Sequence, residues 1–295
     1  MARRNHERLV SSALPLSALL FVLVLASPAA AVAGANILIV SGHDIFGPSG
    51  GYPSTTEEAA GVLNTELTTA GNTVTVVTTG VPANLTGYTQ IYDVRFDNAT
   101  PFTSAEMGYY LTFLQAAPNN TLFLMGENTY FNTRNGLILQ FIAQAGGGTI
   151  ALPVANNINT GTGAYEPETV ASQFATTPNV ISTVTFADCG LMTTAGTGAF
   201  ATSQSAGGCS IFFGRGALQN APQGAVVVVL DVNFIATAPT GFGAANEVAF
   251  RQNLEHFVSD PPVAPPSTPV PNTLILLALG LCSIGIIAIR RRAFA

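Results

Sequence analysis

Polar side chains that could bind a cation or move a proton stand directly after several apolar runs of this sequence. They are His43, Asp44, Asp93, Glu127, Asn128, Arg134 and Asp231. The carboxyl ends of parallel strands meet at one edge of a sheet, where open α/β sheets bind their ligands. Converging carboxylate and amide oxygens suit Ca²⁺, which takes about six to eight oxygen ligands. A histidine among them could instead serve acid–base chemistry or help a divalent metal to activate water.

The same residues also have a structural interpretation. Asp and Asn are ordinary loop residues, and Arg134 could pair with Glu127 simply to orient a loop. Residues 126–135 form the densest polar stretch beside an apolar run, so we expect any ligand contact there first. Within that stretch, Tyr130 and Phe131 could stack on a sugar face or cover the end of a sheet. No cofactor is predicted, and Ca²⁺ is the one candidate ion.

The elements that would position these residues alternate between strand and helix. Apolar runs predict strands at 36–40, 74–77, 90–96 and 121–126. Between them, helices are expected at 54–70, 103–115 and 134–145, the second capped by Ser104. Gly71 and Gly146–Gly148 are expected to end the first and third helices. The predicted fold class is therefore α/β, a flavodoxin-like parallel sheet between two layers of helices.

The composition changes beyond Gly148 to Gly, Thr, Ser, Asn and Ala. Residues 149–215 are expected to form an irregular β-rich insertion, with strand-like runs at 180–186 and 210–213. The main domain resumes with a strand at 225–230 and a helix at 247–258. Cys189 and Cys209 are predicted to form a disulfide that pins the insertion, as exported proteins commonly do.

Charged residues make up only 9% of the chain, against about 25% in an average soluble domain. There is no lysine, and six of the ten arginines stand at the two ends. Residues 34–260 keep four arginines against fifteen acidic residues. Nucleic-acid binding needs a basic surface, so nucleic acid is excluded as a partner.

Residues 1–33 have the pattern of a signal peptide. Arginines at 3, 4 and 8 precede an apolar stretch at 13–26, and Ala31-Val32-Ala33 supplies a cleavage site. Residues 34–260 are therefore expected to be the exported domain.

The other end has the pattern of a membrane anchor. A proline-rich linker at 261–272 leads to an uncharged segment at 273–289, and a basic tail follows at 290–295. The segment would span about 25 Å as a helix, enough for a short crossing of the inner membrane. Its basic end should stay cytoplasmic. A simple tail anchor would share these features.

The order of motifs at this end resembles a PEP-CTERM sorting signal. Pro269-Val270-Pro271, an apolar helix and Arg290-Arg291-Arg292 follow one another, with Val270 where that family has glutamate. The resemblance implies a Gram-negative producer and recognition by an exosortase-like enzyme, whereas cleavage by signal peptidase is expected from the N-terminal pattern. It also implies a membrane-anchored stage and then a place at the cell surface or in the extracellular matrix.

The domain itself resembles class I glutamine amidotransferase-like and ThuA-like domains. The likeness rests on the order of Ile37–Gly42, Asp93–Phe96, Leu122–Asn128 and Gly146–Gly148. The cysteine elbow of the amidotransferases is missing, because Gly126-Glu127-Asn128 stands in its place. No activity is therefore expected from the resemblance.

Two functions follow from the sequence. The favoured one is a non-catalytic surface or envelope protein that binds matrix polysaccharide or another surface component. The alternative is an exported hydrolase or cation-binding domain whose site lies at the strand ends, with His43 and a subset of Asp44, Asp93, Glu127 and Asp231. Beside these two, a ThuA-like sugar-processing domain would have a carbohydrate pocket beside Glu127.

Overall fold

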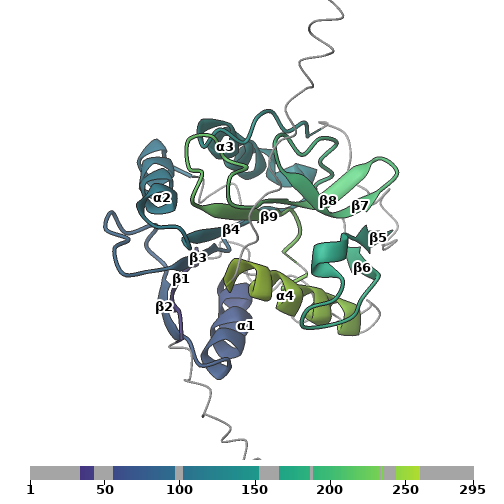
Figure 1. Ribbon diagram of the computed structural model, residues 1–295, viewed down its shortest axis with the longest axis horizontal. Coiled ribbons are helices and arrows are strands. Elements are labelled where there is room, and N and C mark those ends of the chain that lie inside the picture. The colour runs from purple at the N-terminus through teal and green to yellow at the C-terminus, as the bar shows by residue number, and fades with distance from the viewer. Residues whose placement is uncertain are drawn as a thin grey trace, which may run out of the picture. The chain divides into compact units, whose positions relative to one another are not determined.

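A mixed nine-stranded sheet is the centre of the part of the chain that the structure describes (Figure 1). The structure is a computed structural model, and it describes residues 34–42, 56–96, 102–152, 166–186, 189–232, 234–235 and 244–259. The strand order is β2-β1-β3-β4-β9-β8-β7-β5-β6. The fold is thus of the mixed α/β class.

Five neighbouring strands form a parallel half. They are β2 (Thr73–Val77), β1 (Asn36–Val40), β3 (Gln90–Asp93), β4 (Thr121–Met125) and β9 (Ala225–Val229). All residues of β3, β4 and β9 are buried, as expected for continuous apolar strands covered on both faces. The alternation of strands and helices predicted this half of the sheet.

The remaining four strands extend the same sheet in antiparallel fashion. They are β8 (Gly207–Phe213), β7 (Ala199–Gln204), β5 (Glu166–Val170) and β6 (Thr183–Phe186), with β8 paired to β9. The β-rich structure expected here is present among the described residues, but as an antiparallel part of the main sheet and not as a separate irregular insertion. The β-rich segment predicted at 149–215 is a continuation of the main sheet.

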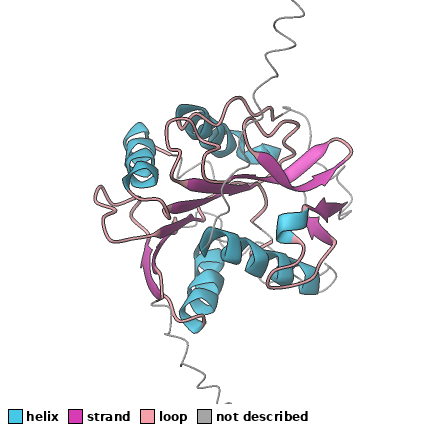
Figure 2. Ribbon diagram, in the orientation of Figure 1, coloured by secondary structure: helices cyan, strands magenta, loops and turns pink. Residues whose placement is uncertain are grey.

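Four α-helices of the described residues cover the two faces of the sheet (Figure 2). α1 (Thr56–Thr69) and α4 (Ala244–Ser259) pack on one face, where Leu63 and Phe250 join the same buried cluster as Phe123. α2 (Ser104–Ala116) and α3 (Asn132–Gln144) pack on the other, where Phe113 and Phe141 join the cluster of Leu122. Two short 3₁₀ helices, η1 (Thr129–Phe131) and η2 (Ser172–Phe174), complete the elements.

The cap of α2 differs from the sequence-based expectation by one residue. The Thr103 side chain accepts the backbone N–H of Glu106, and the Glu106 carboxylate accepts the backbone N–H of Thr103. This reciprocal capping box needs Glu three residues after the cap, and only Thr103 has that spacing; Ser104 is the first helical residue instead.

The described helices include none that is both long and apolar enough to cross a bilayer. The predicted signal peptide at 1–33, the linker, the segment 273–289 and the basic tail lie outside the described residues. They stay predictions.

Candidate functional site

Asp93 is the last residue of β3 and the centre of a buried charge cluster. Its carboxylate accepts hydrogen bonds from the Arg95 guanidinium at 2.9 and 2.7 Å and from the Tyr110 hydroxyl at 2.9 Å. Arg134, from α3, forms an ion pair with the same carboxylate at 2.9 Å. The side chains of Asp93 and Arg134 are fully buried. The helices α2 and α3 and the chain just after β3 are thus tied to the end of one central strand.

Glu106 completes the cluster on the α2 side. Its carboxylate lies 2.9 Å from Arg95 and also accepts the backbone N–H of Val81 at 2.9 Å. The Arg134 guanidinium stacks over the Phe102 ring, 4.0 Å from its centroid. Two arginines therefore face two carboxylates under an aromatic cover, which balances the buried charge.

The cluster holds its carboxylates ionised. Burial alone would raise the pKa of Asp93, but the charges of Arg134 and Arg95, with hydrogen bonds from Arg95 and Tyr110, lower it to about 2. The pKa of Glu106 is also lowered, because Arg95 and two backbone hydrogen bonds outweigh its burial. A carboxyl with a pKa near 2 is a poor general acid or base at neutral pH, since catalytic pKa values lie near the working pH.

Glu127 lies at the ends of β4 and β9 and is also bonded internally. Its carboxylate accepts the backbone N–H of Val232 at 2.6 Å. The Asn135 side chain binds the backbone of the same residue in both directions, accepting from its N–H at 3.1 Å and donating to its carbonyl at 2.5 Å. Asp231 follows β9 and is fully buried. The carboxylate of Glu127 thus fastens the chain beyond β9 to the end of β4.

The loop after β4 separates its two aromatic residues. Asn128 caps η1 by accepting the backbone N–H of Tyr130 at 3.0 Å. Tyr130 is 77% exposed, whereas Phe131 packs edge-on against Phe96 with ring centroids 5.3 Å apart. Tyr130 is therefore the more exposed of the two rings, and Phe131 is half-buried.

The sequence-based site residues are thus divided between two groups. Asp93 and Arg134 form the first, and Glu127 and Asn128 lie at the neighbouring strand end with Asp231. Arg134, which the sequence offered as a partner for Glu127, forms an ion pair with Asp93. The sheet register places Asp93 beside Leu124 of β4, and β4 is the strand that precedes η1 and α3. This register brings Arg134 of α3 to the end of β3. His43 and Asp44 lie outside the described residues.

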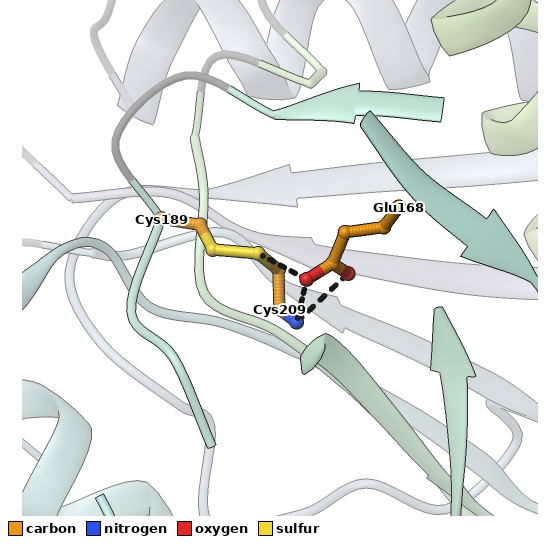
Figure 3. A group of neighbouring side chains, drawn as sticks. All are labelled: Glu168, Cys189 and Cys209. Atoms are coloured by element: carbon orange, nitrogen blue, oxygen red, sulfur yellow. Dashed lines mark hydrogen bonds between the residues drawn. A yellow bond between two sulfur atoms is a disulfide. The ribbon is translucent and has the colours of Figure 1, made fainter. Parts of the chain in front are cut away.

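Sequence reasoning missed a buried carboxylate beside the predicted disulfide. Cys189 and Cys209 form the disulfide, with Cα atoms 5.8 Å apart, which confirms the predicted pair. Glu168 of β5 is fully buried against it and accepts the Cys209 N–H at 3.0 Å (Figure 3). The Thr202 hydroxyl also donates to Glu168 and bonds to Ser210. The one signal in the sequence was a glutamate two residues before Val170 in a stretch not predicted as a strand.

A further group of ionisable side chains joins α1 to α4. Arg251 binds both carboxylate oxygens of Glu66, at 2.8 and 2.6 Å, and donates to the Phe234 carbonyl at 3.1 Å. Burial, and then the charge of Glu66, raises the pKa of Glu255 to about 8. This helix contact is therefore sensitive to pH.

No family model and no curated protein matches this chain. Solved structures resemble it at low identity. The N-terminal domain of mmIFT52 is 11% identical, with a TM-score of 0.54 over 78% of this chain and 100% of that one. The cytoplasmic protein STM1381 from Salmonella typhimurium LT2 is 9% identical, with a TM-score of 0.51 over 76% and 99%. A ThuA-like protein from Bacteroides uniformis ATCC 8492 is 14% identical, with a TM-score of 0.41 over 78% and 91%. At these identities the likeness concerns the fold alone.

Proposed function

We propose that this chain is an exported surface protein whose domain, residues 34–260, binds matrix polysaccharide or another surface component. The proposal for export rests on the two ends of the sequence. The N-terminus has a basic segment, then an apolar segment and then small residues, which is the pattern that signal peptidase cleaves. Pro269-Val270-Pro271, the apolar segment 273–289 and three arginines fit an exosortase-like sorting enzyme.

Binding is favoured over catalysis by the charge cluster at the end of β3. Asp93 is held ionised by two arginines, and Glu127 is bonded to the backbone of Val232. Both carboxylates act as ties between elements. This use of the acidic strand ends is the observation that carries the proposal, because a hydrolase would need such groups near its substrate.

The finer fold assignment is also part of the proposal. The parallel half has the order β2-β1-β3-β4-β9, which corresponds to the 2-1-3-4-5 order of flavodoxin-like sheets. We therefore regard the domain as a flavodoxin-like sheet with an antiparallel extension. The sequence resemblance to ThuA-like domains stays a proposal for the family of this domain.

Sorting is tested with the full-length chain and a variant that lacks residues 269–295. Both are produced in a Gram-negative cell that encodes an exosortase, and the envelope, surface and medium fractions are compared. The full-length protein should reach the surface or the matrix, and the truncated one should be lost from it. Equal distribution of the two proteins, or an intact chain in the cytoplasm, would overturn the proposed sorting.

A further inference from the structure

A cleft of about 440 Å³ lies at the edge of the sheet opposite to the acidic strand ends. One wall is the connection from β2 to β3, residues 83–89, and the other is the C-terminal part of α2. Asn120, which precedes β4, also lines it. Its volume lies within the roughly 300–1,000 Å³ of small-molecule sites.

The walls of the cleft are fixed by hydrogen bonds within the fold. The Asn36 side chain donates to the Gly87 carbonyl at 2.9 Å, and Asn84 accepts the Thr86 N–H at 3.0 Å. Gly87 has a φ of +94°, a conformation that glycine adopts without strain. Across the cleft, the Asn120 side chain donates to the Phe113 carbonyl at 2.6 Å. The cleft is thus formed before any ligand arrives, which lowers the entropic cost of binding.

The lining combines aromatic rings with neutral polar groups. Tyr88 and Tyr109 are half-buried in it, over a floor that includes the buried Leu85 and Phe113. Among the described residues, neither tyrosine hydroxyl has a hydrogen-bond partner, and the lining contains no carboxylate, guanidinium or imidazole. Thr86 and Asn84 add an exposed hydroxyl and an exposed amide.

This combination fits a sugar ring better than other small ligands. A pyranose presents an apolar C–H face, which packs on an aromatic ring, and hydroxyls at its rim, which bond to neutral donors and acceptors. An acidic sugar would need a cation to offset the loss of its hydration, and the lining offers none.

We propose that this cleft binds a short stretch of a neutral polysaccharide, with sugar faces packed on Tyr88 and Tyr109. The proposal rests on the proposed binding function and moves its site away from the loop 126–135, where the sequence placed it. At that loop, the exposed ring is Tyr130 on the short η1 helix. Tyr130 therefore serves as the matched control for the cleft.

The test measures binding of three hexasaccharides to the purified full-length chain: β-1,4-glucan, β-1,4-mannan and alginate. Isothermal titration calorimetry gives the affinity, because the tyrosine fluorescence of the chain comes from seven tyrosines and changes when Tyr88 or Tyr109 is replaced. At least one neutral hexasaccharide should bind, and alginate should not. Tyr88→Ala and Tyr109→Ala should each weaken binding by about tenfold or more, whereas Tyr130→Ala should leave it unchanged.

Tyr88→Phe keeps the aromatic ring, so this variant should keep most of the affinity. It is the control that separates loss of the ring in Tyr88→Ala from misfolding of that variant. Loss of binding in Tyr130→Ala alone would overturn the cleft and leave the proposed binding function standing. Preferential binding of alginate would overturn the neutral ligand. Absence of binding to all three sugars, in a protein that reaches the cell surface, would overturn the cleft but not the sorting.

Discussion

Replacing Asp93 by asparagine should destabilise the domain, because the change keeps the shape of the side chain and removes its charge. Arg95 would keep its ion pair with Glu106, whereas Arg134 would lose its ion pair with Asp93, in a cluster where both Asp93 and Arg134 are fully buried. The uncompensated guanidinium is expensive, since a buried charge needs a partner to offset its lost hydration.

Two estimates bound the loss. The pKa of Asp93 falls from 3.8 to about 2, and that shift corresponds to about 2 kcal/mol in the free energy of unfolding. Breaking a buried pair by removing one partner costs about 3–5 kcal/mol. We therefore expect Asp93→Asn to lower the free energy of unfolding by about 2–5 kcal/mol at pH 7.

Urea unfolding followed by circular dichroism measures this loss, and its pH dependence identifies the cause. A carboxyl whose pKa is lowered by folding stabilises the protein above its unfolded pKa and loses that contribution as the pH falls through the folded one. The difference in the free energy of unfolding between the wild type and Asp93→Asn should therefore become smaller as the pH falls from 4 to 2. Since the arginines contact Asp93 directly, Arg134→Met and Asp93→Asn combined should cost less than the sum of the single changes. Equal stability at pH 7, or additive losses, would refute the assignment of this cluster.

Three further changes test other parts of the structure. Burial and Glu66 raise the pKa of Glu255 to about 8, so the wild type should lose stability between about pH 4.5 and 8 as this buried carboxyl ionises. Glu255→Gln should reduce that loss, and an unchanged pH dependence of the free energy of unfolding, measured with urea, would contradict this. Removal of the disulfide by Cys189→Ala and Cys209→Ala should lower the free energy of unfolding by about 2–4 kcal/mol, and a thermal melt that does not move would exclude a stabilising bond. Thr103→Ala should cost about 1 kcal/mol by losing the cap of α2, while Ser104→Ala should cost much less.

The parallel half of the fold was predictable because its strands are continuous apolar runs. β1 reads Asn-Ile-Leu-Ile-Val and β9 reads Ala-Val-Val-Val-Val, a pattern typical of strands buried on both faces. β5 reads Glu-Pro-Glu-Thr-Val and β7 reads Ala-Phe-Ala-Thr-Ser-Gln, so neither has an apolar run or a clear alternation. Such strands are defined by their neighbours, and the sequence alone indicates only that the region is rich in β structure.

The sequence predicted where the polar side chains at the strand ends would lie, but not which of them would pair. The sequence indicated that Asp93, Glu127 and Arg134 would stand near one edge, since their strands were expected to run side by side. The pairing of Arg134 with Asp93 depends on the register of β3 against β4. Arg95 joins the cluster from the chain just after β3, and Glu106 and Tyr110 join it from α2. The buried position of Glu168 was not predictable for a similar reason, because its partners lie on β7 and β8.

The position of β9 has a consequence for how the chain folds. This strand lies between the parallel and antiparallel halves, and the bond from Val232 to Glu127 spans 105 positions of sequence. Pairing at such a separation is entropically costly and slow, so the centre of the sheet closes late. A chain made from its N-terminus leaves β4 without its second neighbour until β9 has been synthesised. Late closure of this kind would be compatible with the proposed export, in which the chain crosses a membrane before it folds.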